Sequence, residues 1–142
     1  MITISKYVCR YWVLPALTLW TSLASAQLIV TVDPPRIVAQ KTVVRLTMKN
    51  AFSNTVESAR AGMLLLDPQR KLLGQGTRWV IGGTNSTARL PPGATNTFNF
   101  VITSDKQIPT NAIAKVTFSR LVLEGGKLAD VNKDVQIQTG SK

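Results

Sequence analysis

The sequence contains no histidine, and its one cysteine, Cys9, lies within the first 26 residues. Histidine is the usual general base near neutral pH, and thiolates serve cysteine catalysis, thiol redox chemistry and the common zinc sites. Seven carboxylates are present, but nothing in the sequence pairs two of them as glycosidases require. We therefore expect no catalytic residue, no metal site and no cofactor, and we expect that the protein is not an enzyme.

Two polar patterns favour a polar hairpin or strand face over ligand sites. Asp130, Asn132 and Asp134 alternate as ligands do at the start of calcium loops, but Val135 stands where such loops need glycine, and the distant glutamate is missing. The glycines between residues 74 and 83 lack the following helix and the lysine of a phosphate loop. We expect hairpin and bulge positions for these glycines.

The first 26 residues have the three parts of a secretion signal. Lys6 and Arg10 give a positive start, residues 13–23 are mostly apolar, and Ala24-Ser25-Ala26 supplies the small residues that a signal peptidase reads. The alternative is a retained membrane anchor, but the apolar run is shorter than the roughly 20 residues that span a bilayer. We expect cleavage before Gln27 and a periplasmic or extracellular protein.

Acidic residues are scarce relative to basic ones. The chain has 17 Lys and Arg against seven Asp and Glu, and the predicted signal removes two basic residues and no acidic one, which leaves a net charge of +8. This charge favours anionic partners, whereas the single spacing of the basic residues suits a role in solubility alone. The predicted anion contacts are Arg45, Lys49, Arg60, Arg70 and Lys71.

Apolar and polar residues alternate as they do in β-strands, and no segment after the predicted signal has a helical period. The pattern predicts strands at residues 28–32, 42–50, 57–66, 71–80, 96–102, 112–124 and 128–138. Within the sixth of these, the apolar parity changes between Phe118 and Leu121, which predicts a bulge near Ser119 and Arg120.

Seven to eight short strands over about 110 residues predict an all-β protein, an immunoglobulin-like two-sheet antiparallel sandwich. A closed barrel of similar size is the alternative. The absence of any composition shift predicts one domain at residues 27–138, followed by a short tail at 139–142. Asn85-Ser86-Thr87 matches the acceptor sequence for N-glycosylation in a predicted loop.

Four segments follow one another in a recognisable order. A strand ends in Asn50, an aliphatic strand runs through Met63-Leu64-Leu65-Leu66-Asp67, and Pro92-Gly93 precedes the alternating Phe98-Asn99-Phe100. This order resembles small exported bacterial immunoglobulin-like domains of the FxLYD type, although Met63 replaces the phenylalanine of that motif and Leu66 its tyrosine. The resemblance implies the sandwich fold and no particular activity, because that family has no common activity.

The leading hypothesis is a non-catalytic exported module that binds another protein of the envelope or the extracellular space, since sheet edges can accept a partner's strand. The predicted partner contacts are Leu64, Leu66, Arg78 and Trp79, the last two as an exposed aromatic–cation pair. The alternative for Trp79 is a buried position.

A second hypothesis is electrostatic binding to an acidic glycan or an anionic membrane surface through a basic face of the sandwich. Nucleic acid is not an expected partner, because three of the four phenylalanines stand at inward strand positions and cannot stack on bases. A small-molecule substrate is not expected either.

Overall fold

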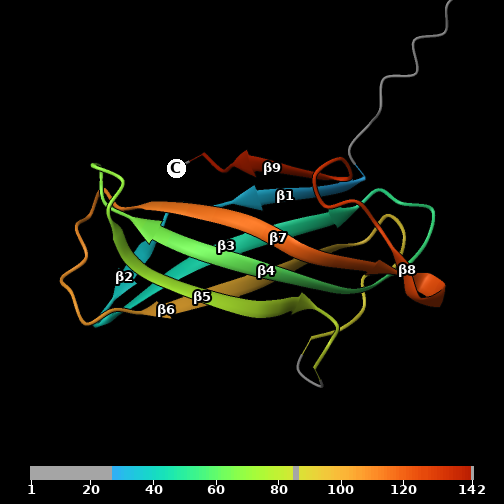
Figure 1. Cartoon of the computed structure of the whole chain (residues 1–142), viewed down its shortest axis with the longest axis horizontal. Coiled ribbons are helices and arrows are strands. Elements are labelled where there is room, and N and C mark those ends of the chain that lie inside the picture. The colour runs from blue at the N-terminus through green and yellow to red at the C-terminus, as the bar shows by residue number, and fades with distance from the viewer. Residues whose placement is uncertain (1–26, 85–86, 142) are drawn as a thin grey trace, which may run out of the picture.

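Figure 1 shows the computed structural model of the protein, which describes residues 27–84 and 87–141. The predicted signal at residues 1–26 and Asn85 of the predicted glycosylation site lie outside the described residues. The predicted division into signal, domain and tail stays a prediction.

The described residues form nine strands in two sheets, which confirms the predicted all-β sandwich. Seven strands have five residues or more, and β2 and β8 are shorter. Sheet A consists of β1 (Leu28–Val32), β2 (Arg36–Val38), β3 (Lys41–Asn50), β6 (Thr95–Thr103) and β9 (Val135–Thr139). Sheet B consists of β4 (Val56–Leu66), β5 (Leu72–Ile81), β7 (Ile113–Leu123) and β8 (Lys127–Leu128).

In sheet A, β3 pairs with β6 on one side and with β1 and β2 on the other, and β9 pairs with β1. In sheet B the order is β5-β4-β7-β8. All of these pairs are antiparallel except β1 with β9, which are parallel. The sequence did not predict this parallel pair, which places β9 at one edge of sheet A (Figure 1).

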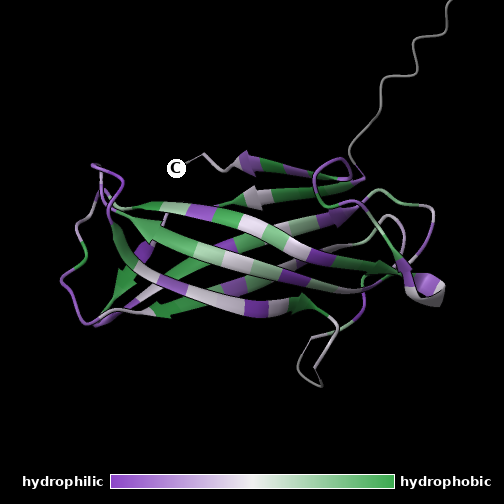
Figure 2. Cartoon of the chain, in the orientation of Figure 1, coloured by the Kyte–Doolittle hydropathy of each residue, from purple (hydrophilic) through white to green (hydrophobic). Residues whose placement is uncertain are grey.

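Hydrophobic and hydrophilic residues alternate along several of the long strands (Figure 2), and the hydrophobic ones are those buried in the core. In β3, Val44, Leu46 and Met48 are buried, while Arg45 and Lys49 are exposed. Side chains of successive strand residues point to opposite faces, so the apolar set of each sheet lies against that of the other. The single core cluster between the sheets follows directly from this alternation.

The predicted bulge in β7 is confirmed. Arg120 pairs with Arg60 of β4, but the next pair along the ladder joins Phe118 to Ala61, which leaves Ser119 as an extra residue. An extra residue shifts the parity of the strand. Phe118 before the bulge and Leu121 after it can therefore both point into the same core.

The prediction of one closing strand at residues 128–138 was wrong. β8 ends at Leu128 in sheet B, and β9 begins at Val135 in sheet A. Between them, the Asp134 N–H donates to the Asp130 carbonyl (2.8 Å), and the Asp130 N–H donates to Asp134 Oδ2 (3.0 Å). These hydrogen bonds close a turn, and the chain crosses there from one sheet to the other.

One long side of the sandwich is closed, because β5 lies close to β6. A β-carbon built on Gly74 would lie 2.8 Å from Ile102 Cγ2, and one on Gly76 would lie 3.3 Å from Phe100 Cε1. A side chain at either position would press on a buried residue of β6, so glycine favours this close approach of the two sheets. The predicted bulge role fits Gly74, which lies beside the register shift between Leu65 and Leu66, but it was wrong for Gly76, which pairs regularly with Met63.

Candidate functional site

On the opposite long side of the sandwich, β7 runs along the edge of sheet A formed by β1 and β9 (Figure 1). A groove of about 640 Å³ lies between the two sheets there. Its volume is in the range of protein sites that hold ligands of several hundred daltons. The aliphatic residues of β1, β7 and β9 that line it are Val32, Ile113, Ala114, Val116 and Ile137.

β7 has a free edge beside this groove. β4 pairs with β7 over the whole strand, whereas β8 pairs on the other side only with Val122 and Leu123. Among the described residues, no further strand pairs with β7 at Ile113–Arg120. Alternate backbone N–H and C=O groups of this stretch therefore point outward along an edge that can accept another strand.

Two large aliphatic side chains at the groove are only half covered. Ile113 of β7 is 51% exposed, and Ile137 of β9 is 45% exposed. They come from different sheets, so apolar surface of both layers borders the open side. A partner that fills the groove would remove this surface from water, at about 25 cal/mol for each Å² buried.

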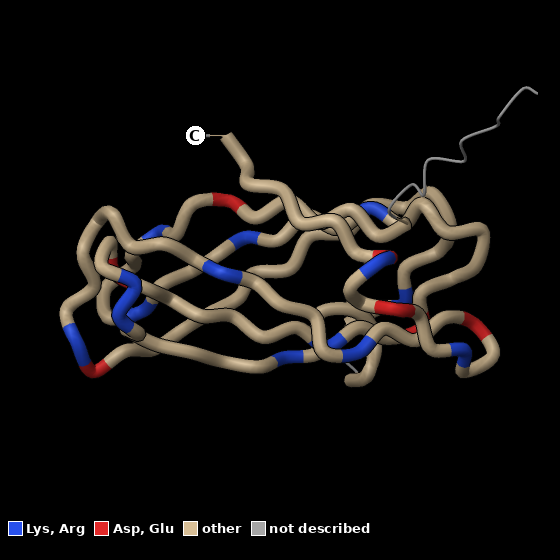
Figure 3. Tube along the Cα trace, turned by 45° about the horizontal axis from the view of Figure 1, so that its top comes forward, with Lys and Arg blue, Asp and Glu red and all other residues tan. Residues whose placement is uncertain are grey.

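The charged residues at the groove are Asp33, Arg70 and Lys115. β7 itself carries Lys115 and Arg120 and no carboxylate. Figure 3 shows basic residues along the strands of both sheets, with few acidic residues among them. The charge around the free edge of β7 therefore favours an acidic partner over a basic one.

The predicted partner contacts Leu64 and Leu66 do not lie at a sheet edge. Both are half-buried and belong to β4, which is paired with β5 on one side and β7 on the other. The backbone of this strand is therefore unavailable to a partner. Leu66 lines the groove, and Leu64 does not.

Arg78 and Trp79 do not form the predicted aromatic–cation pair. They are consecutive residues of β5, so their side chains leave the strand in opposite directions. The cation against the indole is Arg60, whose guanidinium carbon lies 5.9 Å from the ring centroid, while an Arg78 guanidinium N–H donates to the Thr77 carbonyl (2.9 Å). Trp79 is half-buried on the outer face of sheet B.

The five predicted anion contacts do not share one face, so the prediction of a single basic face was wrong. Arg45 and Lys49 are exposed on β3 in sheet A, and Arg60 is exposed on β4 in sheet B. Arg70 and Lys71 lie in the turn between β4 and β5. The alternation of the sequence shows that these side chains point outward, but it does not show to which sheet each strand belongs.

Three groove residues were not predicted as contacts, namely Ile113, Val116 and Ile137. Their apolar character is visible in the sequence, but their position at an open side depends on which strands pair. Arg120 was not predicted as a contact either, although the predicted bulge near Ser119 and Arg120 is consistent with its exposed position. These residues, together with the free edge, give the site a capacity for binding through backbone, apolar and charged contacts.

Two further features of the described chain concern ligands and membranes. Residues 27–84 and 87–141 contain no group of three or more His, Cys, Asp or Glu side chains arranged to hold a metal ion. The same residues form no helix with the length and apolarity needed to cross a membrane. The carboxylate of Asp130 accepts the Asn132 N–H (2.9 Å), so it is engaged within the turn between β8 and β9.

No protein-family model and no curated protein matches the chain, so the resemblance to FxLYD-type domains stays a prediction. Among solved structures, the chain is similar to the ApaA protein from Bordetella pertussis (20% identity, TM-score 0.48, 72% of this chain and 84% of that chain). It is also similar to IrmA from Escherichia coli (10% identity, TM-score 0.49, 78% and 90%) and to a structural genomics consortium target (15% identity, TM-score 0.46, 72% and 76%). These similarities assign no family and no activity to the chain.

Proposed function

We propose that this protein is a non-catalytic, exported binding module that holds an extended segment of a partner protein as an added strand beside β7. The observation that carries the proposal is the free edge at Ile113–Arg120 next to an apolar groove between the sheets. An added strand satisfies the outward backbone groups by hydrogen bonds, and every second side chain of that strand enters the groove.

The length and lining of the edge define the partner segment. Eight residues in β conformation extend about 26 Å at 3.3 Å per residue, so a segment of similar length fits the edge. The side chains that enter the groove meet Val32, Val116 and Ile137, which favours aliphatic residues at alternate positions. Ala114 leaves the most space on the β7 wall, so the largest partner side chain belongs opposite it.

The charge of the edge indicates what lies on the outer side of the added strand. Lys115 and Arg120 lie on the outer face of β7, and cross-strand pairs of opposite charge are favourable. The partner segment should therefore carry acidic residues between its aliphatic ones. A second copy of this chain fits less well, because two β7 edges would bring together two basic strands from molecules of net charge +8.

The predicted secretion signal supports an exported location for this activity. A partner in the cell envelope or the extracellular space meets the protein after the predicted cleavage before Gln27.

The experiment compares two isoleucine variants that differ only in their place on the sandwich. Ile137→Thr removes aliphatic surface from the groove, whereas Ile37→Thr removes a similarly exposed isoleucine (42% against 45%) from β2, away from the groove. Each tagged protein is cross-linked in its own cell envelope and medium and washed in about 1 M salt, where charges are screened within about 3 Å.

The expected result is capture of a specific protein by the wild type and by Ile37→Thr, and at least about tenfold less capture by Ile137→Thr. Hydrogen exchange of the complex should also slow at the Ile113–Arg120 amides. Capture that Ile137→Thr leaves unchanged, or failure of the wild type to capture any protein, would contradict the proposal.

A further inference from the structure

We propose that the outer face of sheet B binds an acidic polysaccharide, with Arg60 and Arg120 as the contacts for its carboxylate or sulfate groups. This site lies on the face formed by β5, β4 and β7. It differs from the groove, which lies between the two sheets, although Lys115 borders both and Arg120 belongs to the edge proposed for the partner strand.

Arg60 and Arg120 are two positively charged residues at paired positions of β4 and β7. They are directly opposite on neighbouring strands, and both side chains are exposed. Side chains in such positions are about 5 Å apart at their β-carbons, and two like charges there destabilise the sheet. A bound anion between the two guanidinium groups turns this repulsion into attraction.

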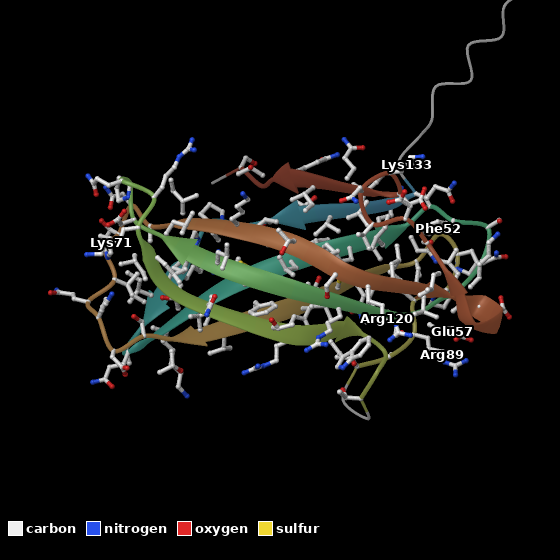
Figure 4. The ribbon with its side chains drawn as sticks, in the orientation of Figure 1. Phe52, Glu57, Lys71, Arg89, Arg120 and Lys133 are labelled. Carbon is white, nitrogen blue, oxygen red and sulfur yellow. The ribbon has the colours of Figure 1, made fainter. Side chains whose placement is uncertain are left out.

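No carboxylate of the protein compensates this pair within the described residues. The one ion pair among residues 27–84 and 87–141 joins Arg89 to Glu57 (3.9 Å), and Glu57 is the only acidic residue on β4, β5 or β7. Figure 4 labels Glu57, Arg89 and Arg120. The nearest carboxylate along β4 is thus engaged by a different arginine, and Arg60 and Arg120 are available to a ligand.

Trp79 lies at cation–π distance from the Arg60 side chain. Its indole lies 5.9 Å from the Arg60 guanidinium carbon, and Gly83 lies against the ring on the turn that follows β5. A β-carbon on Gly83, which has φ +75°, would lie only 2.5 Å from Trp79 Cδ2. An arginine at cation–π distance from an aromatic ring is attracted to it while its N–H donors stay free for an anion.

Two residues along β4 from Arg60, the outer face of sheet B carries two threonine hydroxyl groups on either side of a glycine. Gly62 of β4 lies between Thr117 of β7 and Thr77 of β5. The two threonine Oγ1 atoms lie 3.3 Å and 3.9 Å from the position of a β-carbon on Gly62. This row suits the hydroxyl groups of a sugar, which donate and accept hydrogen bonds.

The spacing of the cations favours a polymer over a single anion. Lys115 lies opposite Leu64, four residues along β4 from Arg60, which corresponds to about 13 Å. A ligand with one anionic group cannot contact both places, whereas a chain with repeated anionic groups can. A nucleic acid fits less well, because Gly83 covers one face of the only aromatic ring in this row, and bases need a free ring face for stacking.

The test uses two double variants that each remove two positive charges. Arg60→Gln/Arg120→Gln changes the proposed site, and Arg45→Gln/Lys49→Gln changes the outer face of sheet A as a matched control. Titration calorimetry measures binding of polygalacturonate, which carries carboxylates, and of heparin, which carries sulfates as well. Neutral dextran and vesicles of anionic phospholipid are the comparison ligands.

The expected result is binding of polygalacturonate, heparin or both, no binding of dextran, and affinity that falls as salt rises. Arg60→Gln/Arg120→Gln should lower the affinity at least about tenfold, and the matched control no more than about threefold. Binding should change the emission of Trp79, because an anion then lies beside the Arg60 guanidinium that the indole contacts. Ile137→Thr should leave this binding unchanged, which separates it from the groove.

Three results would overturn the proposal. Equal losses in the two double variants would show that the overall charge, and not this site, attracts polyanions. Binding of vesicles without binding of either polysaccharide would assign the face to a membrane surface. A wild-type protein that binds neither polysaccharide at low salt would exclude the site altogether.

Discussion

Asn50 is expected to be the polar residue on which the stability of the sandwich depends most. It is fully buried at the end of β3. Its Nδ2 donates to the carbonyls of Leu90 (2.9 Å) and Asn54 (3.0 Å), and its Oδ1 accepts the Phe52 N–H (2.8 Å). These bonds join the end of β3 to the loop after it and to the residue that pairs with the start of β4.

The cost of Asn50→Ala follows from the groups that lose a partner. The Phe52 N–H is buried and would have no acceptor, which costs about 1–3 kcal/mol. The Leu90 carbonyl keeps the Val56 N–H as a donor, so its loss is nearer 1 kcal/mol, and the exposed Asn54 residue can turn to water. We expect a total of about 3 kcal/mol and a fall in Tm of about 12 °C for a domain of this size.

Urea unfolding of the purified protein, followed by circular dichroism, measures this loss. Asn54→Ala is the control, because it keeps the carbonyl that Asn50 contacts and changes only an exposed side chain, so its effect should stay within about 0.5 kcal/mol. A loss below about 1 kcal/mol for Asn50→Ala would refute the reasoning, since the Phe52 N–H would then have found another acceptor.

Two further changes test single contacts. Thr42→Val should raise the free energy of unfolding by about 1 kcal/mol, because the Thr42 hydroxyl is buried with no hydrogen-bond partner among the described residues; a lower urea midpoint would contradict this. Gly83→Ala should cost more than Gly125→Ala. Both glycines have positive φ (+75° and +79°), so alanine at either position lowers the free energy of unfolding by about 1–2 kcal/mol. Only an alanine at position 83 would also press on Trp79. Equal losses of stability for the two variants would therefore mean that the indole does not lie against residue 83.

The strands could be predicted from the sequence because alternation depends only on the geometry of one strand. The buried residues of β3 and the extra residue at Ser119 follow from the apolar parity of their own segments. The prediction of one closing strand at residues 128–138 was wrong because alternation reports only on the geometry of a single strand. Val131 and Val135 have the parity of one strand, but the aspartate hydrogen bonds at residues 130–134 form a turn that this parity does not reveal.

The candidate sites could be predicted only in part, because they depend on which strands are neighbours. Arg45 and Arg60 both alternate with buried residues, and the sequence alone does not place them on opposite sheets. The aliphatic run at Leu64–Leu66 suited either a covered strand or an edge, and the pairing of β4 on both sides decides for the covered strand. The pairing of Arg60 with Arg120 likewise depends on the register between β4 and β7, which the sequence alone does not give.

The free stretch of β7 differs from the other edges of the sandwich in a way that supports a partner there. Exposed edges invite aggregation, so proteins shorten them, interrupt them with proline or cover them. Pro34 and Pro35 separate β1 from β2, β9 has five residues, and β5 lies against β6, where the Ser104 hydroxyl donates to the Leu73 carbonyl (2.8 Å). Ile113–Arg120 is eight residues long, contains no proline and borders half-exposed isoleucines of both sheets. Lys115 is the only charged residue of this stretch before the bulge, so the stretch has little protection against pairing with another strand. This is expected for an edge that a partner strand covers.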